Sequence, residues 1–286
     1  MSNYRIAFST LACPEWPLGE IVRRAREYGY DGIELRGLLN EIDVTRRPEF
    51  APASLAATRR MFEEEGLKVC CLGSSVRLLH TAGPEASKRD EEEFARYLEL
   101  SAGLGGVPIR IFGGHLPEGL DRERALAQAT ESLERLAEAA RAVQTLVLVE
   151  SHDGFCSGRD LGALLRRCDA PNVGALWDVF NSQMPGSESV EETYSELRSF
   201  VRHIHVKDGD PGQERPLYTP LGEGKIPYSD VLRLLRADDY SGWLSVEWEK
   251  RWHPELLDPE LVLPQYARRL RQLVPDSGPT EERSGA

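Results

Sequence analysis

The sequence predicts an α/β fold, a single (β/α)8 TIM barrel in which eight strand-and-helix pairs follow one another. Three observations support this prediction. Strand-like and helix-like patterns alternate from residue 5 to about residue 270. The strand runs are apolar almost throughout, as in a parallel sheet that is covered on both faces. The first strand is followed by STLACPEW rather than by the glycine-rich turn of a doubly wound open sheet, which is the alternative.

The expected strands are short apolar runs, beginning with RIAFST and ending with GWLSVEWEK. Between them lie segments whose apolar residues recur at helical spacing, and the first of these, PLGEIVRRAREYG, ends in a glycine, a usual helix stop. The strands are expected at residues 5–10, 32–37, 68–75, 108–114, 145–151, 173–181, 201–209 and 242–250. The helices are expected at residues 17–29, 54–66, 90–105, 121–144, 157–168, 189–200, 227–240 and within 254–274.

The chain is expected to form one barrel domain over residues 1–274, with a flexible polar tail, VPDSGPTEERSGA, of which residues 275–286 lie beyond the barrel. Three connections are long, at residues 38–53, 76–89 and 208–226. All three follow strands and so lie at the C-terminal face of the barrel, where active sites of this fold are built and where a long loop can act as a lid.

The composition excludes several classes of protein. The net charge of −12 opposes binding to a phosphate backbone, so no nucleic acid partner is expected. No apolar run is long enough to cross a bilayer, and MSNYRIAFST does not read as a signal peptide, so we expect no membrane association and a cytoplasmic protein. The five cysteines fit neither a disulfide framework nor a zinc knuckle, and we expect reduced thiols.

Ionisable residues stand at the ends of the last four expected strands: Glu150, Asp178, His205 and Glu247. In a closed barrel their side chains would converge, and three carboxylates do not stay ionised together without a cation. One such residue alone more often anchors a loop, but four on consecutive strands predict a divalent metal site. Three oxygen ligands and one nitrogen favour Mn²⁺, with Mg²⁺ or Co²⁺ as alternatives, over structural Zn²⁺.

The segment HIHVKDGD, at residues 203–210, places two histidines on the same face of a strand. His205 is nearer the expected mouth and is the predicted ligand. His203 is one pleat deeper and is expected to pack or to support the ligands. Lys207 lies on the same face and would neutralise a substrate oxyanion, or else form a salt bridge with Asp208 or Glu223.

Further candidates for substrate contacts lie near strand ends, where each has an alternative role in loop capping or packing. They are His152, Asn181, Lys207, Arg36, Arg110, His115, Trp16 and Trp248. Trp177 is expected to pack in the core. The turn GEGK, at residues 222–225, lacks the pattern of a phosphate-binding loop and is a weak candidate for one.

The chain resembles the xylose isomerase-like barrels, the sugar phosphate isomerase/epimerase superfamily. The resemblance is carried by DGIELRG, VLVESHD, ALWDVFN, HIHVKD, LGEGKIPYSDVL and GWLSVEWEK. It implies a metal site at the same four residues, a divalent metal that is commonly Mn²⁺, and a homodimer or homotetramer. The superfamily's ketose 3-epimerases carry a histidine, an arginine and a glutamate where this chain has Asn181, Pro211 and Cys156, which argues against a free ketohexose as substrate.

The expected chemistry is proton transfer through a metal-bound enediolate on a keto sugar or related polyol ketone, with Glu150 and Glu247 as the acid/base pair. Return of the proton to the same carbon or to its neighbour gives an epimerase or an isomerase. Loss of a β-hydroxyl would instead give a lyase or dehydratase of a keto sugar or inosose, the main alternative. A metal-dependent abasic-site endonuclease would need further histidines on strands 3 and 4, which end in CLGSS and IFGG. A non-enzymatic binder of sugar or metal is the third alternative.

Overall fold

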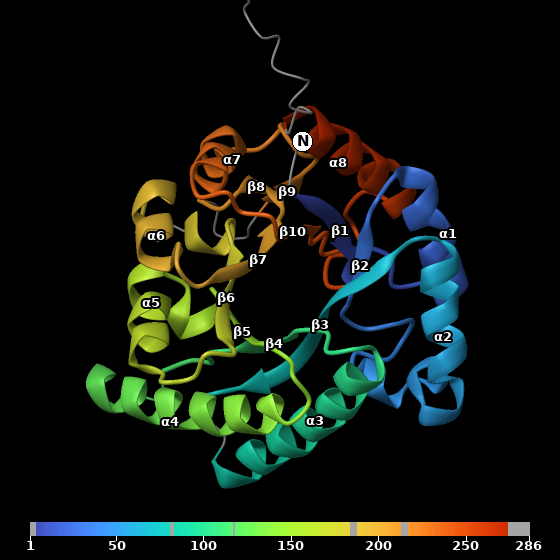
Figure 1. Ribbon diagram of the computed structural model, residues 1–286. Coiled ribbons are helices and arrows are strands. Elements are labelled where there is room, and N and C mark those ends of the chain that lie inside the picture. Colours follow the sequence, from blue (N-terminus) through green and yellow to red (C-terminus); the bar gives the residue numbers. More distant parts are fainter. Residues whose placement is uncertain (1–3, 81–82, 117, 184–187, 213–216, 274–286) are drawn as a thin grey trace, which may run out of the picture.

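The barrel predicted from the sequence is confirmed by the computed structural model, which describes residues 4–80, 83–116, 118–183, 188–212 and 217–273. Eight parallel strands close in the order β1, β2, β3, β4, β5, β6, β7 and β10, with β10 beside β1. Viewed along the barrel axis, helices α1 to α8 form a ring around the strands in chain order (Figure 1). The tail at residues 275–286 lies outside the described residues.

The elements follow the expected alternation. The barrel strands are β1 (Arg5–Ser9), β2 (Gly32–Leu35), β3 (Lys68–Arg77), β4 (Ile109–Phe112), β5 (Val147–Glu150), β6 (Val173–Asp178), β7 (Val201–Val206) and β10 (Trp243–Val246). The helices are α1 (Leu18–Tyr28), α2 (Pro52–Glu64), α3 (Pro84–Gly103), α4 (Arg122–Arg141), α5 (Gly158–Arg167), α6 (Val190–Leu197), α7 (Tyr228–Ala237) and α8 (Pro259–Leu273).

The helix ends have the chemistry that their sequences indicate. Helix α1 ends at Gly29, which has a left-handed backbone with φ of 80° and donates its N–H to carbonyls of the last turn. Helix α6 begins with a capping box, in which Ser189 and Glu192 each accept the other's backbone N–H. The capping box fixes where α6 leaves its loop at the mouth of the barrel, whereas Gly29 ends α1 at the opposite end, before β2.

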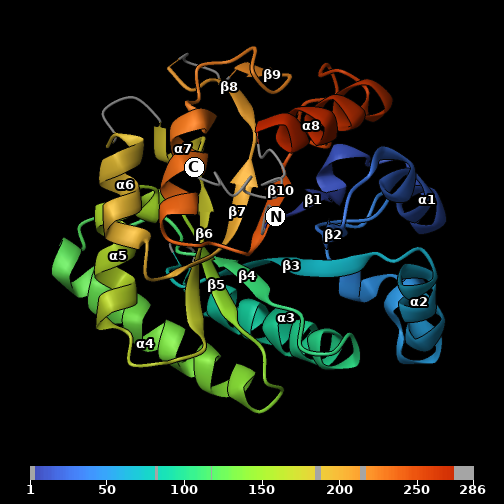
Figure 2. The same cartoon turned by 45° about the horizontal axis from the view of Figure 1, so that its top comes forward.

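All three connections expected to be long loops contain regular structure, and the one at residues 38–53 carries two short 3₁₀ helices, Val44–Arg46 and Pro48–Phe50. Strand β3 continues to Arg77 and helix α3 begins at Pro84, so the connection expected at residues 76–89 is much shorter. The connection after β7 carries a small antiparallel hairpin, β8 (Asp208–Asp210) and β9 (Leu217–Thr219), which the sequence analysis did not predict. Figure 2 shows this hairpin at one end of the barrel, near α7 and α8.

The buried carboxylate of Asp208 organises the connection after β7. Its oxygens accept hydrogen bonds from the backbone N–H groups of Gly209 at 2.8 Å, Gly222 at 2.7 Å and Gly224 at 3.2 Å. The GEGK turn therefore holds an internal carboxylate with the amides that a phosphate would need. Its suggested phosphate-binding role is not supported by this arrangement.

The interior of the barrel is apolar at one end and charged at the other. A small apolar cluster fills it on the side of the strand N-termini, formed by Ala7, Cys70, Cys71, Leu148, Leu176 and Trp243. The next layers toward the strand C-termini contain buried charged residues instead of the branched apolar residues usual in such barrels. Since buried charges need partners, this layer is the place to look for chemistry. No helix within the described ranges is long and apolar enough to cross a membrane.

Candidate metal centre and active site

The four residues expected at the strand ends converge in the barrel. Glu150 and Asp178 are the last residues of β5 and β6, and the backbone pairing sets Asp178 beside His205 of β7. Glu247 directly follows β10 and continues its pairing, since its N–H donates to the Val206 carbonyl at 3.0 Å. Each residue offers one ligand atom, and all four atoms lie within 4.8 Å of one another. All four residues are buried.

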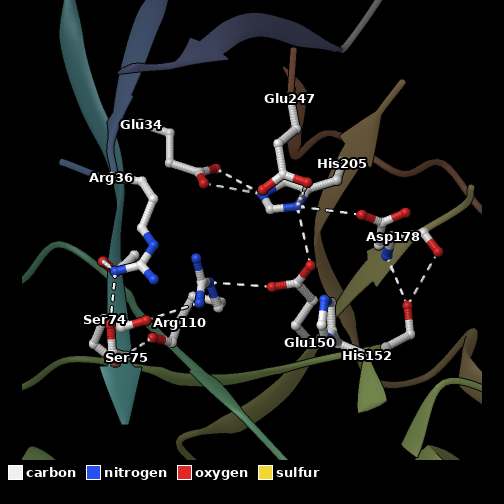
Figure 3. Close-up of polar contacts among 12 residues, drawn as sticks. Glu34, Arg36, Ser74, Ser75, Arg110, Glu150, His152, Asp178, His205 and Glu247 are labelled. Carbon is white, nitrogen blue, oxygen red and sulfur yellow. Dashed lines mark hydrogen bonds and ion pairs between the residues drawn. The ribbon is translucent and has the colours of Figure 1, made fainter. Parts of the chain in front are cut away.

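The His205 ring directs its two nitrogens to different groups. Its Nε2 lies 2.9 Å and 3.0 Å from the two carboxylate oxygens of Glu34 on β2. Its Nδ1 faces the three carboxylates, at 3.4 Å from Glu247, 3.5 Å from Glu150 and 3.7 Å from Asp178, and has no hydrogen-bond partner. Figure 3 shows the ring between Glu34 and the other three acids. Nδ1 is therefore the atom free to bind an ion.

Glu34 is fully buried and also receives His203, whose Nε2 lies 2.8 Å from it. Burial alone would raise the pKa of the Glu34 carboxyl, but the two imidazoles outweigh it and hold the pKa well below its usual value. Burial lowers the pKa of His203, so its neutral ring donates a hydrogen bond to Glu34. A histidine that gives one ring N–H to a carboxylate and turns its other nitrogen to a metal is a common arrangement in metal sites.

Lys207 provides a positive charge beside Asp178 and Glu247, on the side of the cluster away from Glu34. Its ammonium is buried and lies 2.9 Å from Asp178, 2.7 Å from Glu247 and 2.7 Å from Glu249. Burial would lower the pKa of Lys207, but Asp178 and Glu247 raise it well above its usual value. The alternative salt bridges with Asp208 and Glu223 are absent from the contacts of Lys207. The lysine instead contacts two of the expected metal ligands.

Arg110 on β4 provides a second cation, which lies next to Glu150. Its Nε lies 3.2 Å from Glu150 Oε2, and its Nη1 donates to the Ser74 carbonyl at 2.8 Å. Burial raises the pKa of Glu150, but Arg110 and His205 outweigh it and hold the pKa below its usual value. For Glu247 the pKa is held well below its usual value by His205 and Lys207, against the effect of burial. Both glutamates are therefore ionised in the metal-free protein and can accept a proton.

The polar candidates at the mouth differ in their placement. His152 is partly exposed, with Nδ1 at 2.8 Å from Asp153, and its ring packs against Phe112. Asn181 donates its backbone N–H to Asp178 at 2.8 Å, while its buried side-chain nitrogen has no hydrogen-bond partner. His115 is 71% exposed and lies 3.3 Å from Asp153. Of these, Asn181 has a buried donor available to a ligand, whereas His115 lies at the rim.

The tryptophans pack away from the cluster. Trp248 is buried, its indole N–H donates to the Leu257 carbonyl at 2.9 Å, and its ring faces Tyr266 of α8. Trp177 is likewise buried and bonds Ser182, as a core residue does. Trp16 is partly buried against the core, with Arg24 over its ring. Neighbouring residues on a strand point to opposite faces, so Glu247 inside the barrel leaves Trp248 facing the helices. These contacts favour packing over the expected sugar contacts of Trp16 and Trp248.

Glu34 was not predicted as a site residue from the sequence, although it lies in the segment DGIELRG. The signal was present: Glu34 is a charged residue between Ile33 and Leu35 in an apolar strand, which is the pattern that identified the other acids. It also stands two residues before Arg36, a candidate in its own right, and two residues along a strand share a face. Arg110 was named as a candidate but not given its position beside Glu150.

The family model described as xylose isomerase-like TIM barrel matches residues 22–273, and the chain belongs to this family. Among curated relatives, fructoselysine 3-epimerase of Escherichia coli O157:H7 is 25% identical over 280 residues, which cover 91% of this chain and 94% of that protein. An inosose dehydratase of Clostridium botulinum is 23% identical over 186 residues and covers 59% of each chain. These two relatives are named as an epimerase and a dehydratase, and a hydroxypyruvate isomerase of Escherichia coli K12 is 24% identical over 170 residues, which cover 56% of this chain and 63% of that protein.

Solved structures share the fold. The IOLI protein, described as having a bound zinc atom, superposes with a TM-score of 0.76 at 17% sequence identity, over 94% of this chain and 98% of that one. At this identity the likeness establishes the architecture alone.

Proposed function

We propose that the chain is a divalent-metal-dependent isomerase or epimerase of a keto sugar or a related polyol ketone. The observation that carries this proposal is the convergence of Glu150, Asp178, His205 and Glu247 within 4.8 Å in the barrel. A relative that matches over 94% of its own length is named as a 3-epimerase of fructoselysine, a compound of the same general class.

The donor set fits a hard divalent ion. Three buried carboxylates and the unpartnered Nδ1 of His205 offer the three oxygens and one nitrogen that suit Mn²⁺ or Mg²⁺, with Co²⁺ as an alternative. Glu34 holds the His205 ring by its other nitrogen and so keeps Nδ1 directed at the acids. The IOLI structure is described with zinc, so metal analysis has to include that ion. We favour Mn²⁺ because oxygen ligands predominate.

A bound divalent ion would stabilise the negative charge that develops on a substrate carbonyl oxygen when the neighbouring C–H loses its proton. The protein supplies the proton acceptors. Glu150 and Glu247 lie on β5 and β10, with β6 and β7 between them, and can approach a bound substrate from two sides. One removes the proton and the other returns one, which inverts the carbon in an epimerase.

Further residues would hold the substrate. Lys207 keeps its positive charge at the cluster and stabilises the ionised form of Glu247. The free side-chain nitrogen of Asn181 and the partly exposed ring of His152 can bond substrate hydroxyls. Their positions at the ends of β5 and β6 place them beside Glu150 and Asp178.

A dehydratase is the second candidate. The first proton removal would be the same, and the buried ammonium of Lys207, 2.7 Å from Glu247, could protonate a departing hydroxyl. The similarity to an inosose dehydratase supports this alternative. The two activities differ in product, since only the dehydratase releases water and forms a conjugated or deoxy ketone.

The deciding experiment is incubation of the Mn²⁺-loaded protein with ketoses, aldoses, inososes and 3-keto sugars in D₂O, followed by NMR and mass spectrometry. Deuterium at one carbon with inversion indicates an epimerase, transfer to the neighbouring carbon an isomerase, and formation of a product that has lost water a dehydratase. The proposal would be contradicted if the protein bound no divalent ion. It would also be contradicted if the wild-type protein exchanged no C–H of any compound, as is expected of an Asp178→Asn variant that lacks one metal ligand. We also propose a homodimer or homotetramer, which light scattering tests.

A further inference from the structure

Two arginines lie side by side in the barrel, next to the candidate metal centre. Arg36 follows β2 and is 7% exposed, and Arg110 on β4 is 1% exposed. Gly73 on β3 makes room for both of them. A Cβ atom at Gly73 would lie 2.9 Å from Arg36 Cδ and 3.0 Å from Arg110 Nη2. Any larger residue at this position would displace the pair.

The two guanidinium groups differ in their partners. Arg110 has a carboxylate, since its Nε lies 3.2 Å from Glu150. Arg36 bonds only neutral groups, the Ser75 hydroxyl at 3.0 Å and the Gly73 carbonyl at 3.4 Å. Within the described part of the chain, Arg36 forms no ion pair. Glu93 of α3 lies in the same region, but its carboxylate accepts the Ser75 backbone N–H at 2.6 Å.

A buried cation without a counter-ion, next to a second cation, is costly to maintain. Burial and the charge of Arg110 together lower the pKa of Arg36 to about 10, which still leaves the group charged at neutral pH. The arrangement by itself does not stabilise the folded state. An anion bound between the two guanidinium groups would offset this cost.

The position of the pair relates it to the candidate active site. Arg110 contacts Glu150, so the pair lies beside the cluster on the β2 and β4 side, across from Lys207. Figure 3 shows Arg36 and Arg110 together next to Glu34 and Glu150. Lys207 is already surrounded by Asp178, Glu247 and Glu249, whereas Arg36 has no carboxylate in direct contact among the described residues.

We propose that Arg36 and Arg110 bind a carboxylate group of the substrate, which makes the substrate a hydroxy keto acid instead of a neutral keto sugar. This inference rests on the proposed function, because it assumes that the substrate occupies the neighbouring cluster. A carboxylate matches the site in shape and charge. Its planar pair of oxygens fits the guanidinium fork, and its single negative charge balances the one guanidinium that has no acid.

The test uses three unreactive three-carbon probes that have no carbonyl group: glycerate, glycerol and glycerol 3-phosphate. They share a hydroxyl-bearing chain and differ in the terminal group, which is a carboxylate, a hydroxyl or a phosphate. Binding is measured by calorimetry on the full chain, both metal-free and Mn²⁺-loaded. We expect glycerate to bind roughly tenfold to a hundredfold more tightly than glycerol, as a charge-assisted bond to a buried group predicts. Glycerol 3-phosphate should bind less tightly than glycerate.

The variant Arg36→Gln should remove the preference for glycerate, while the binding of glycerol stays the same. It should melt at the wild-type temperature or above, because it removes an uncompensated buried charge. The matched control is Arg202→Gln, which changes the net charge equally at an exposed position of β7 and should leave the preference intact. If Arg36→Gln does not fold, the ranking of the three probes by the wild-type protein still decides.

Three results would overturn the proposal: equal binding of glycerate and glycerol by the wild-type protein, tightest binding of the phosphate, or an unchanged preference for glycerate in Arg36→Gln. In the last case the metal itself would hold the carboxylate. Failure of the proposed function gives a different pattern, in which the protein binds no divalent ion and exchanges no C–H yet still prefers glycerate through Arg36.

Discussion

The role of Glu34 gives the sharpest test of how the metal centre is built. We predict that Glu34→Gln weakens the binding of Mn²⁺ about 10- to 100-fold, the usual effect of losing a carboxylate that orients a metal-binding histidine. This range corresponds to about 1.4–2.8 kcal/mol. The polar contacts of the Glu34 carboxylate are with His203 and with the expected ligand His205, at 2.9 Å and 3.0 Å from the latter.

The magnitude follows from the geometry. The Glu34 carboxylate accepts from two imidazoles, His203 at 2.8 Å and His205 at 2.9 Å, with all three groups buried. A glutamine has almost the same size but only one accepting oxygen, and its NH₂ group would face the second ring N–H as donor against donor. One ring N–H therefore faces a donor where it had a carboxylate oxygen: that of His205 if the NH₂ group takes the Oε1 position, or that of His203 if it takes the Oε2 position. The free energy of unfolding of the metal-free protein should fall by about 1–3 kcal/mol, the cost of a buried polar group without a partner.

The assay is calorimetric titration of Mn²⁺ into the metal-free variant, together with urea unfolding. The control is Glu64→Gln, the same substitution at an exposed position of α2, which should change neither quantity. If Glu34→Gln binds Mn²⁺ as tightly as the wild-type protein and unfolds at the same urea concentration, the His205 ring is held by other contacts and the reasoning is wrong.

Four further predictions concern the same cluster. His205→Ala should abolish Mn²⁺ binding in calorimetry, whereas His203→Ala should mainly lower the melting temperature; the reverse result would exchange their roles. Glu247→Gln should keep much of the metal affinity and lose about two to four orders of magnitude in kcat, and turnover like that of the wild type would move the proton transfer to another group. Lys207→Met should destabilise the metal-free protein by about 3–5 kcal/mol, because Asp178, Glu247 and Glu249 lose a buried partner, and Mn²⁺ should then raise its melting temperature by more than it does for the wild type. In the metal-free protein Glu247 and Glu34 raise the pKa of His205 well above its usual value, against the effect of burial, so a bound metal must displace a proton from the ring. The affinity for Mn²⁺ should therefore rise with pH at and below that pKa. An affinity that does not change from pH 6 to 8 would contradict this.

Much of the candidate site could be predicted because strand ends in a parallel barrel all reach the same face. Asp178 and His205 are distant in the sequence, with helix α6 between them, yet the pairing of β6 with β7 sets them side by side. Knowing the fold, an alternating strand such as HIHVKDGD already indicates which residues point inward. The choice of His205 over His203 as the residue facing the acids followed from strand direction alone.

The candidates on loops were less predictable. Trp16, Trp248 and His115 were selected because they stand near strand ends, and proximity in sequence does not say which way a loop residue turns. The contacts that place Trp248 against α8 and His115 at the exposed rim depend on loops that pack only in the folded chain. The β8–β9 hairpin was missed for the same reason, since its amides are arranged around Asp208, a residue with no periodic signal.

The sequence by itself determined the barrel, the inward face of each strand and the four residues that converge, because hydrophobic periodicity and chain direction are local properties. Only the tertiary structure decided how the charges are shared. Glu34 pairs with two histidines and Lys207 with three acids, whereas Arg36 forms no ion pair within the described chain. These contacts bring together strands that are distant in sequence. Such contacts depend on distances of about 3 Å across the barrel, where a shift of one residue in strand pairing exchanges a partner for a neighbour on the opposite face.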